Sequence, residues 1–387
     1  RPVEGHRLIV RRWPSLVCAE RSVWMGIPII FDKPFKTYDE QIAHLRDNYG
    51  LDIVDEELAK YILSTFSYYD IINGYQECMM QNGKFKEGIS LLYLYFFHLF
   101  DKEFQNILFK NILLIENSFK AKLAYSISAH YGVSMYDYLD KANYKPGYKG
   151  KIFFNILKTN IFREIGKTDK QNNLIACTKQ PCKHYYDTHH HIPAWILMKN
   201  VSFDKAITLY LLLKPEVKEE VTNALISVDV PIKDKIAFVT SALTLIRKFR
   251  NVIAHNLKFV TYSQKNSKLP YKTTLNLIKE ESATAGITSF DDTYGCLIAI
   301  FILLNDTKEQ ISFLKCLQKL LTAPPLGVEE LQPLTKYIVN HYLEITGLGT
   351  DFSNKLIGLT RACIKSAILS EQKKKGFMDK LKETFDD

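Results

Sequence analysis

KDKIAFVTSALTLIRKFRNVIAHN, residues 233–256, is the stretch that decides the fold of this chain. Its apolar side chains recur at alternating steps of three and four residues, which is the spacing of one face of an α-helix. They are Ile236, Val239, Leu243, Ile246 and Ile253. One position of the series lacks a hydrophobic side chain, and it holds Arg250. The spacing predicts a helix from about Lys233 to His255.

Arg250 takes a position where packing would favour leucine. Because an unpaired buried guanidinium costs free energy, we expect it either to meet a carboxylate or to line an internal cleft that faces an anion. Arg247, Asn251 and His255 succeed one another at steps of four and so share one helix face. Arg250 and His255 lie about 140° apart around the helix, so they converge only because arginine is long and the helix is near its end.

Arginine, asparagine and histidine in this arrangement suit the cleavage of RNA. A histidine moves protons near neutral pH, as a general base toward a ribose 2′-hydroxyl or as a general acid toward the leaving oxygen. Arginine can hold and neutralise the pentacoordinate phosphate, and asparagine can orient either partner. This chemistry needs no metal and no cofactor. The spacing alone favours a plainer alternative, a core arginine with satisfied hydrogen bonds and a histidine that ends a helix.

Most of the remaining chain shows the same helical spacing. A first helix is framed by Thr37 and Glu40, which form a capping box, and by Gly50, where a left-handed residue would end it. Further helices are predicted at about 55–69, 88–100, 102–131, 202–213, 291–305, 308–322 and 328–346. Strand-like alternation is confined to 259–263 and 271–277, which could form one β-hairpin or a loop excursion. The fold class is therefore mainly α.

The composition is that of a soluble globular protein: 387 residues, 47% hydrophobic and 24% charged, which excludes a disordered or fibrous chain. The seven cysteines are odd in number and scattered, unlike those of a disulfide-stapled secreted scaffold, so we expect a cytoplasmic location. The longest apolar run, residues 294–304, is shorter than the ~20 residues that span a bilayer. We therefore predict a buried helix there and no integral membrane association.

The net charge of +9 is concentrated in residues 141–183, which hold ten basic residues against two acidic ones. Aromatic side chains interleave with these bases, at Tyr144, Tyr148, Phe153, Phe154 and Phe162. Phosphate contacts combined with base stacking are typical of RNA binding. The candidate RNA-binding residues are Lys145, Lys149, Lys151, Lys158, Arg163 and Tyr148. The alternative is a solvated basic loop whose aromatic residues belong to the core.

A cysteine- and histidine-containing segment is a weaker candidate for a metal site. Cys177, Cys182 and His184 are followed by three histidines at 189–191, and all of these side chains carry atoms that can bind zinc. The Cys-x4-Cys spacing lacks a second matching knuckle. We therefore expect a polar loop here and assign no metal ligands.

Glu116 and Lys120 are four residues apart on a predicted helix. The simplest interpretation is an i,i+4 ion pair. In the alternative, Glu116 reaches Arg250 or His255 from a neighbouring helix, where its carboxylate would compensate the arginine and tune the histidine.

The string RNVIAHN, residues 250–256, resembles the Arg-polar-x-x-x-His signature of HEPN ribonucleases. Other strings are similar to those of one branch of that group, the bacterial abortive-infection (Abi) proteins of the AbiD/AbiF-like type. These strings are KPFKTYDEQI at 33–42, YYDIINGY at 68–75, IENSFK at 115–120 and IPAW at 192–195 followed by Ser202 and Phe203. The resemblance extends over about residues 33–256.

The resemblance implies a HEPN-type helical bundle with additional helices that cleaves RNA without a metal and serves as a toxin-like defence against phage. It implies catalytic roles for Arg250, Asn251 and His255 and supporting roles for Glu116, Lys120 and Arg247. It also implies a homodimer, because HEPN sites are usually composed of two facing motifs, and an antitoxin protein or a non-coding RNA as a further partner. In-line attack by the 2′-hydroxyl would leave a 2′,3′-cyclic phosphate.

Three positions depart from the family pattern. Asp70 stands where the family usually has arginine, Asp204 where it usually has glycine, and Lys120 where an arginine commonly follows the glutamate. The Arg-Asn-x-x-x-His core is intact. An alternative from another class of function is a non-catalytic scaffold that binds RNA or a protein partner through the same bundle and basic surface.

Four segments are expected along the chain. Residues 1–24 show no clear period and precede Met25, the expected start, so they are interpreted as an upstream extension. Residues 25–260 form the Abi-like helical domain, and 261–369 form a C-terminal helical part of the same unit. Residues 370–387 form an amphipathic helix predicted to pack on the same chain or on a second subunit. The alternative for this helix is a peripheral membrane contact.

Overall fold

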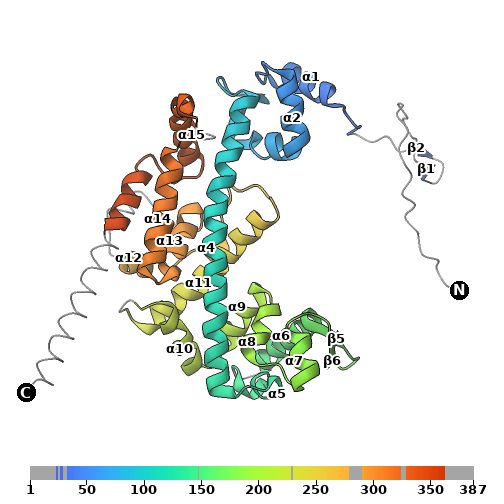
Figure 1. Cartoon of the computed structure of the whole chain (residues 1–387), viewed down its shortest axis with the longest axis vertical. Helices are drawn as coiled ribbons and strands as arrows, with labels where there is room; N and C mark the ends of the chain where they lie inside the picture. The colour runs from blue at the N-terminus through green and yellow to red at the C-terminus, as the bar shows by residue number, and fades with distance from the viewer. Residues whose placement is uncertain are drawn as a thin grey trace, which may run out of the picture.

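The computed structural model describes residues 23–24, 27–28, 33–146, 148–227, 230–278, 290–323 and 328–361, and its fold is mainly α, as predicted (Figure 1). The predicted helix at 370–387 and nearly all of the predicted extension at 1–24 lie outside these residues. The α-helices are α1 (Tyr38–Tyr49), α2 (Glu56–Phe66), α3 (Gln76–Met79), α4 (Leu91–Tyr131), α5 (Met135–Tyr138), α6 (Tyr148–Ile165), α7 (Cys182–His189), α8 (Ala194–Asn200), α9 (Phe203–Leu212), α10 (Pro215–Leu225), α11 (Ile232–Ala254), α12 (Tyr271–Ile278), α13 (Thr293–Leu304), α14 (Thr307–Thr322) and α15 (Gln332–Ile345). Other short elements are the π-helix η1 (Tyr69–Asn73), the 3-10 turns η2 (Lys141–Asn143), η3 (Lys265–Ser267) and η6 (Glu329–Leu331), and the strands β1 (Val23–Trp24), β2 (Ile27–Pro28), β3 (Met80–Gln81), β4 (Lys84–Phe85), β5 (Gly166–Thr168) and β6 (Leu174–Cys177).

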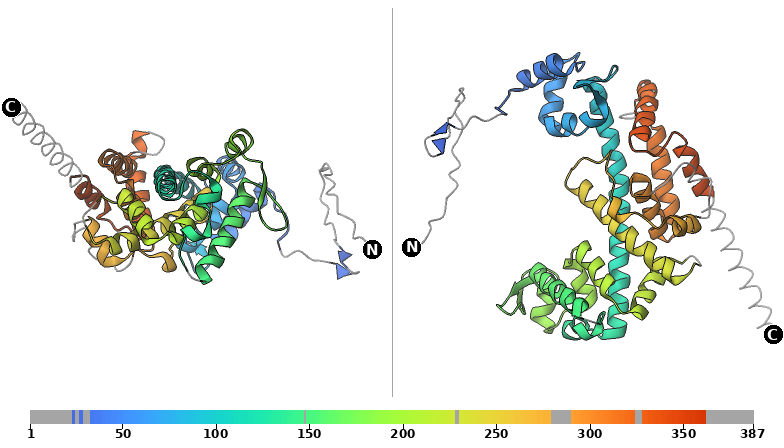
Figure 2. Two further views of the ribbon diagram at one scale, coloured as in Figure 1. Left: turned by 90° about the horizontal axis from the view of Figure 1, so that it is seen from below. Right: turned by 180° about the vertical axis from the view of Figure 1, so that it is seen from behind.

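The long helix α4 forms the axis of the molecule (Figures 1 and 2). It has 41 residues, which corresponds to about 60 Å. The prediction of two helices, at 88–100 and 102–131, was wrong. The charged triplet at 101–103 does not break the helix, because charged side chains are compatible with helical backbone and the Asp101 carboxylate is held in the core by three hydrogen bonds.

The other helices pack around α4. Helix α11 crosses it and also contacts α9, α10 and α13, while α14 and α15 lie along the N-terminal half of α4 (Figure 1). The apolar run predicted to be a buried helix forms α13, whose residues from Thr293 to Leu303 are all buried. Among the described residues, no helix has the length and apolar character that crossing a bilayer requires.

Of the two alternatives for 259–263 and 271–277, the β-hairpin was wrong, and the loop holds only for 259–263. Residues 271–278 form α12, and its buried positions fall at helical rather than alternating steps. Phe259 and Val260 are buried in a turn that follows α11. Paired strands occur elsewhere, β1 with β2, β3 with β4 and β5 with β6. The threonines at 273 and 274 favour strands by propensity, but packing of α12 against α11 outweighs that preference.

A buried polar network joins Tyr75, which lies between η1 and α3, to α4 and α15. Asp101 is 2% exposed; its Oδ1 accepts a hydrogen bond from the Tyr342 hydroxyl at 2.9 Å. Its Oδ2 accepts from the Tyr75 hydroxyl at 2.9 Å and from Gln105 Nε2 at 2.8 Å. His98 Nδ1 lies 2.8 Å from the Tyr75 oxygen and donates to it, because the single hydroxyl proton of Tyr75 goes to Asp101. Burial raises the pKa of Asp101 and lowers the pKa of His98 to about 4.

Lowering the pH from 7 to 5 is expected to reduce the free energy of unfolding by about 2 kcal/mol through His98 alone. Burial holds the pKa of His98 at about 4 in the folded protein, against 6.5 for a solvated histidine. The unfolded state therefore binds more protons between these two values. The contribution of His98 is complete above a pH of about 6.5 and is lost as the pH falls toward 4. Urea unfolding at both pH values measures the change.

Asp101 has the opposite effect on the pH dependence of stability. Because its pKa is raised in the folded protein, this group increases the free energy of unfolding as the pH falls. Comparison with His98→Gln isolates the histidine. This variant should lose about 2 kcal/mol less than wild type between pH 7 and 5, whereas His184→Gln, at an exposed position, should behave as wild type. Equal losses in wild type and His98→Gln would contradict the prediction.

Candidate functional site

The C-terminal end of α11 carries the predicted Arg-Asn-x-x-x-His motif. The helix ends because Asn256 adopts a left-handed backbone conformation, with φ of 52°, and the Leu257 N–H donates to the Val252 carbonyl at 2.9 Å. His255 caps the helix and is exposed, and its side chain makes no hydrogen bond with another described residue. This imidazole is therefore accessible to a ligand.

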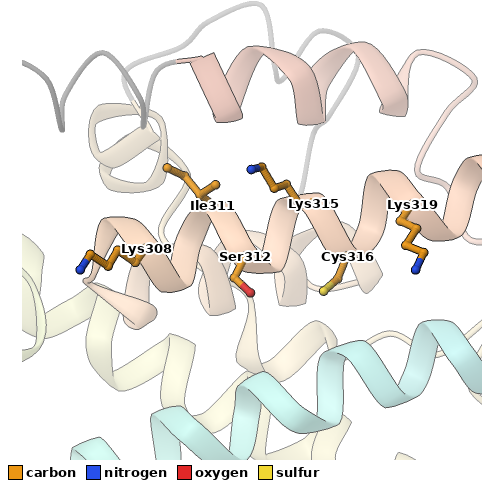
Figure 3. Close-up of a pocket in the computed structure, with 6 residues that line it drawn as sticks. All are labelled: Lys308, Ile311, Ser312, Lys315, Cys316 and Lys319. Carbon is orange, nitrogen blue, oxygen red and sulfur yellow. The ribbon is translucent and has the colours of Figure 1, made fainter.

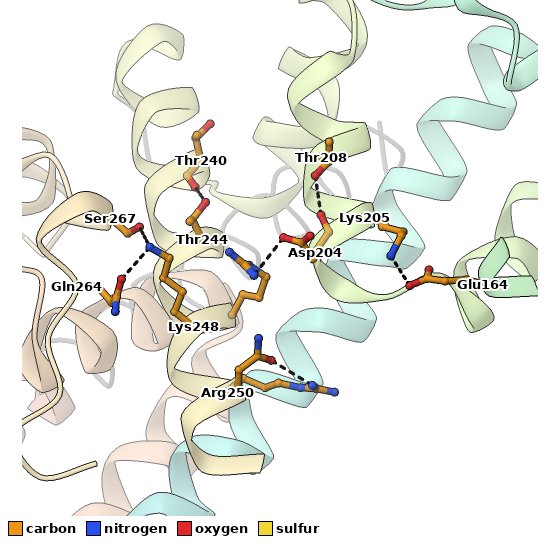
Figure 4. Close-up of polar contacts among 12 residues, drawn as sticks. Glu164, Asp204, Lys205, Thr208, Thr240, Thr244, Lys248, Arg250, Gln264 and Ser267 are labelled. Carbon is orange, nitrogen blue, oxygen red and sulfur yellow. Dashed lines mark hydrogen bonds and ion pairs between the residues drawn. The ribbon is translucent and has the colours of Figure 1, made fainter. Parts of the chain in front are cut away.

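Arg250 lies at the edge of the buried face of α11 and is half-buried. Its Nη1 donates to Asn251 Oδ1 at 3.3 Å (Figure 4). Its Nε is buried and has no hydrogen-bond partner in the described part of the chain. The carboxylate partner that we considered for this arginine is not found there either, since no described Asp or Glu forms an ion pair with it. The guanidinium charge is therefore uncompensated over these residues.

The two basic neighbours of Arg250 on α11 are both engaged. Arg247 Nη1 lies 3.1 Å from Asp204 Oδ1, an ion pair that joins α11 to the first turn of α9 (Figure 4). Lys248 Nζ donates to Gln264 and to Ser267, each at 2.8 Å. Asp204 therefore gives Arg247 a carboxylate partner, whereas Arg250 has no such partner among the described residues.

Glu116 and Lys120 form the predicted i,i+4 ion pair on α4, with Oε1 and Nζ 2.6 Å apart. Their side chains are only 13% and 14% exposed. The other carboxylate oxygen of Glu116 is buried without a partner among the described residues, and the alternative contact with Arg250 or His255 is not formed there. Glu116 on α4 and Arg250 on α11 therefore each keep one buried polar atom without a hydrogen-bond partner among the described residues.

The structure thus brings Arg250 and Asn251 into contact and places His255 on the next turn. The side chains of Arg250 and His255 do not hydrogen-bond to each other in the described structure. The long arginine side chain was expected to reach toward His255, and no such contact is formed in the described part of the chain. A cation, an amide and a titratable imidazole nevertheless occupy one accessible helix end. This arrangement can bind an anion and transfer a proton beside it.

Comparison with known protein families gives a match over half of the chain. The family model described as Abi-like protein matches residues 61–260, which begin within α2 and continue past α11. The chain belongs to the Abi-like protein family. No curated protein and no solved structure matches it. The matched residues of this Abi-like protein include the whole candidate site at the end of α11.

The basic segment of the Abi-like protein folds into η2, α6 and the hairpin of β5 and β6. Lys149 and Lys151 lie in the first turn of α6, are exposed, and form no ion pair with another described residue. Lys145 is exposed beside Lys218, whose pKa is lowered to about 7 first by burial and then by the charge of Lys145. These positions keep uncompensated positive charge at the surface.

Two other predicted RNA-binding residues are engaged within the protein. Lys158 Nζ donates to the Leu139 carbonyl at 3.0 Å, and Arg163 Nη2 donates to Asn172 Oδ1 at 2.9 Å. The side chain of Tyr148 lies outside the described part of the structure.

Some aromatic residues of the basic segment belong to the core, and one is exposed where it could stack on an RNA base. Tyr144, Phe154 and Phe162 are buried, and the rings of Tyr144 and Phe154 stack at 4.1 Å. Phe153 is 59% exposed. Most of the placed rings are therefore core residues, and Phe153 is available to stack on a base.

The segment considered for zinc is not the loop that we predicted. Cys177 ends β6 and Cys182 begins α7, and both are buried free thiols. Burial raises the pKa of Cys177 to about 11 and that of Cys182 to about 12, so both remain protonated at neutral pH. Over the described residues, no three or more His, Cys, Asp or Glu side chains are grouped so as to hold a metal ion.

Two larger grooves lie away from this site. One, of about 480 Å³, runs along α14 from Lys308 to Lys319 and includes Cys316 (Figure 3). Its lining contains lysines but no histidine or carboxylate that could exchange protons. The other, of about 560 Å³, lies between α4, α14 and α15 and has largely apolar walls. Neither groove is lined by a histidine or an arginine, and the end of α11 carries both.

A small recess beside η1 was not predicted from the sequence. It has a volume of about 50 Å³ and is bounded by η1, by α4 and by residues 256–259, which directly follow His255. The sequence signal that could have indicated it is the string at 68–75, which the resemblance identified without assigning it a role.

Proposed function

We propose that this Abi-like protein is a HEPN-type endoribonuclease that acts in abortive infection, the defence in which a bacterium halts phage replication. Family membership supports the role in abortive infection. The end of α11 supports the ribonuclease, with Arg250 and His255 as catalytic residues and Asn251 as the residue that orients Arg250. The reaction needs no metal ion.

The observation that carries the proposal is the state of Arg250. Its guanidinium is half-buried, contacts Asn251, has a buried Nε without a partner and meets no carboxylate in the described residues. A charge in this condition is destabilising unless an anion compensates it. The phosphodiester of RNA is such an anion, and the exposed imidazole of His255 follows five residues later, at the end of the helix.

The proposed reaction is a transesterification within the RNA. The ribose 2′-oxygen attacks phosphorus while the bond from phosphorus to the 5′-oxygen breaks. One imidazole accepts the 2′-hydroxyl proton, and a proton is delivered to the departing 5′-oxygen. Arg250 compensates the charge that develops on the phosphoryl oxygens. The products are a 2′,3′-cyclic phosphate and a 5′-hydroxyl end.

A homodimer would complete this site. The reaction has two proton transfers, and one chain supplies one accessible histidine at the end of α11. Two copies that face each other through this end would contribute two imidazoles and two guanidinium groups. The exposed lysines of α6 would then guide the RNA electrostatically toward the shared cleft.

The test is cleavage of total RNA by the purified protein in EDTA, followed by analysis of the fragment ends. His255→Ala protein purified in the same way controls for contaminating nucleases. Cleavage by wild type alone, with 2′,3′-cyclic phosphate and 5′-hydroxyl ends, is the expected result. Absence of cleavage by either protein, with RNA still bound, would favour the alternative of a non-catalytic RNA-binding scaffold. Cleavage that requires a divalent ion would contradict the proposed mechanism.

Removal of two exposed lysines from α6 should weaken RNA binding without affecting chemistry. The double variant Lys149→Ala/Lys151→Ala is expected to raise the Kd for single-stranded RNA. The slope of log Kd against log salt should fall in magnitude by about 1.4, because each phosphate contact contributes about 0.7. The kcat at saturating RNA should stay unchanged.

Measurement of Kd at several salt concentrations decides this prediction. Lys336→Ala is the matched control, since Lys336 is exposed on α15, away from the basic segment. An unchanged salt slope in the double variant would show that α6 does not contact the RNA backbone.

A further inference from the structure

The recess beside η1 lies next to the proposed catalytic histidine along the chain. Asn256, which lines it, directly follows His255, so their Cα atoms are about 3.8 Å apart. The remaining walls come from η1 and from α4 near Lys102. A group bound in the recess would therefore lie beside the backbone that immediately follows the proposed catalytic histidine.

Several residues of the string at 68–75 have a clear structural role. Ile71 and Ile72 are buried in the core, and Tyr75 donates to Asp101. Gly74 is required because a Cβ there would lie 2.4 Å from the Asp70 carbonyl oxygen. These positions account for the local fold of η1 and need no ligand.

Tyr69 and Asn73 have no comparable role. Tyr69 is 69% exposed, and neither its ring nor its hydroxyl contacts another described residue through a ring or hydrogen-bond interaction. The side-chain amides of Asn73 and Asn256 likewise make no hydrogen bond within the described residues. The recess thus presents an exposed aromatic ring beside two amides that are free to bind a ligand.

The charges around the recess favour a nucleobase over a phosphate. Lys102 and Lys258 supply cationic donors, but Lys258 is paired with Glu77, and the carboxylates of Asp70 and Asp101 also line the recess. A phosphate offers only acceptors and would be repelled by these carboxylates. A base edge carries both donors and acceptors and can satisfy such a mixed lining.

The volume of the recess defines how a base would bind. About 50 Å³ holds roughly four water molecules, which is too little to enclose a purine or pyrimidine ring. The exocyclic groups on one edge of a base do fit. The ring itself would remain outside, where Tyr69 provides an exposed aromatic surface.

We propose that the recess beside η1 is a nucleobase subsite, in which the base adjoining the scissile phosphate stacks on Tyr69 and presents its polar edge to Asn73 and Asn256. The proposal rests on the ribonuclease function proposed above and assigns its RNA specificity to this subsite. Tyr69 and Asn73 bind substrate and take no part in proton transfer.

The test compares cleavage of one defined RNA by wild type, Tyr69→Ala, Tyr69→Phe and Asn73→Ala, with all cleavage positions sequenced. Tyr69→Ala should raise KM about tenfold with kcat nearly unchanged, because loss of one stacked base weakens binding by that order. Tyr69→Phe should retain the wild-type KM. Asn73→Ala should broaden the base preference beside the cleaved bond. Tyr125→Ala is the matched control, since its ring is 73% exposed and lies about 36 Å farther along α4 than Asp101.

Unchanged KM and cleavage positions in Tyr69→Ala and Asn73→Ala would overturn the subsite and leave the ribonuclease intact. If wild type cleaves no RNA, titration with the four nucleoside monophosphates and with inorganic phosphate, monitored by NMR, tests the recess independently. Nucleotide binding that Tyr69→Ala weakens, without binding of inorganic phosphate, would support the subsite. Equal binding by wild type and Tyr69→Ala, or none, would overturn it.

Discussion

Replacement of His255 by alanine is expected to lower kcat for RNA cleavage by about 10²–10⁴-fold, while the Kd for RNA stays within about twofold. The imidazole is exposed at the end of α11 and has no side-chain hydrogen bond to another described residue, so its removal leaves no buried group unpaired. The fold should therefore be preserved. Single-turnover cleavage in EDTA measures the rate, and binding to a non-cleavable 2′-deoxy analogue measures the affinity.

Two comparisons make the His255→Ala result specific. His184→Ala removes another exposed histidine of the family-matched region and should cleave RNA at the wild-type rate. Arg250→Lys keeps a positive charge but loses the planar fork that binds two phosphoryl oxygens, so its kcat should fall by at least about tenfold. A His255→Ala enzyme that retains wild-type kcat would remove this histidine from the mechanism.

The helices whose signals are local could be predicted from the sequence. At α1 the Thr37 N–H donates to Glu40 at 2.7 Å, and Gly50 has φ of 63°, as the capping box and the left-handed end require. The apolar spacing of α11 likewise placed its ends within a residue or two. Such features depend on neighbours three or four positions apart, which a sequence displays directly.

The errors came from contacts between distant residues. The charged residues 101–103 were predicted to separate two helices, because a sequence does not show that Tyr342, 241 positions away, holds Asp101 in the core. Residues 271–277 were predicted as half of a hairpin or as a loop and not as helix α12, because the packing of this segment against α11 cannot be read from threonine propensity. At the site, the motif could be located from the sequence. The pairing of Arg247 with Asp204 and the recess beside η1 could not be predicted, since each joins elements separated in the sequence.

Asp101→Ala is expected to lower the free energy of unfolding by about 3 kcal/mol. The carboxylate accepts from Tyr75, Gln105 and Tyr342 within the core, so its removal leaves three buried donors without their acceptor. Each such donor costs about 1–3 kcal/mol. Burial disfavours the ionised form of Asp101 and so raises its pKa, and relief of that cost on replacement offsets part of the loss.

Urea unfolding of Asp101→Ala, Glu103→Ala and Tyr342→Phe separates these contributions. Glu103 is exposed two positions farther along α4, so its replacement should change stability by less than about 0.5 kcal/mol. Tyr342→Phe removes one of the three donors and should cost about 1 kcal/mol.

Tyr342 lies on α15, beyond the family-matched residues 61–260. If the network couples α15 to α4, Asp101→Ala should also make α15 more sensitive to limited proteolysis than Glu103→Ala does. Wild-type stability and proteolysis in Asp101→Ala would show instead that α15 is held by its apolar contacts alone.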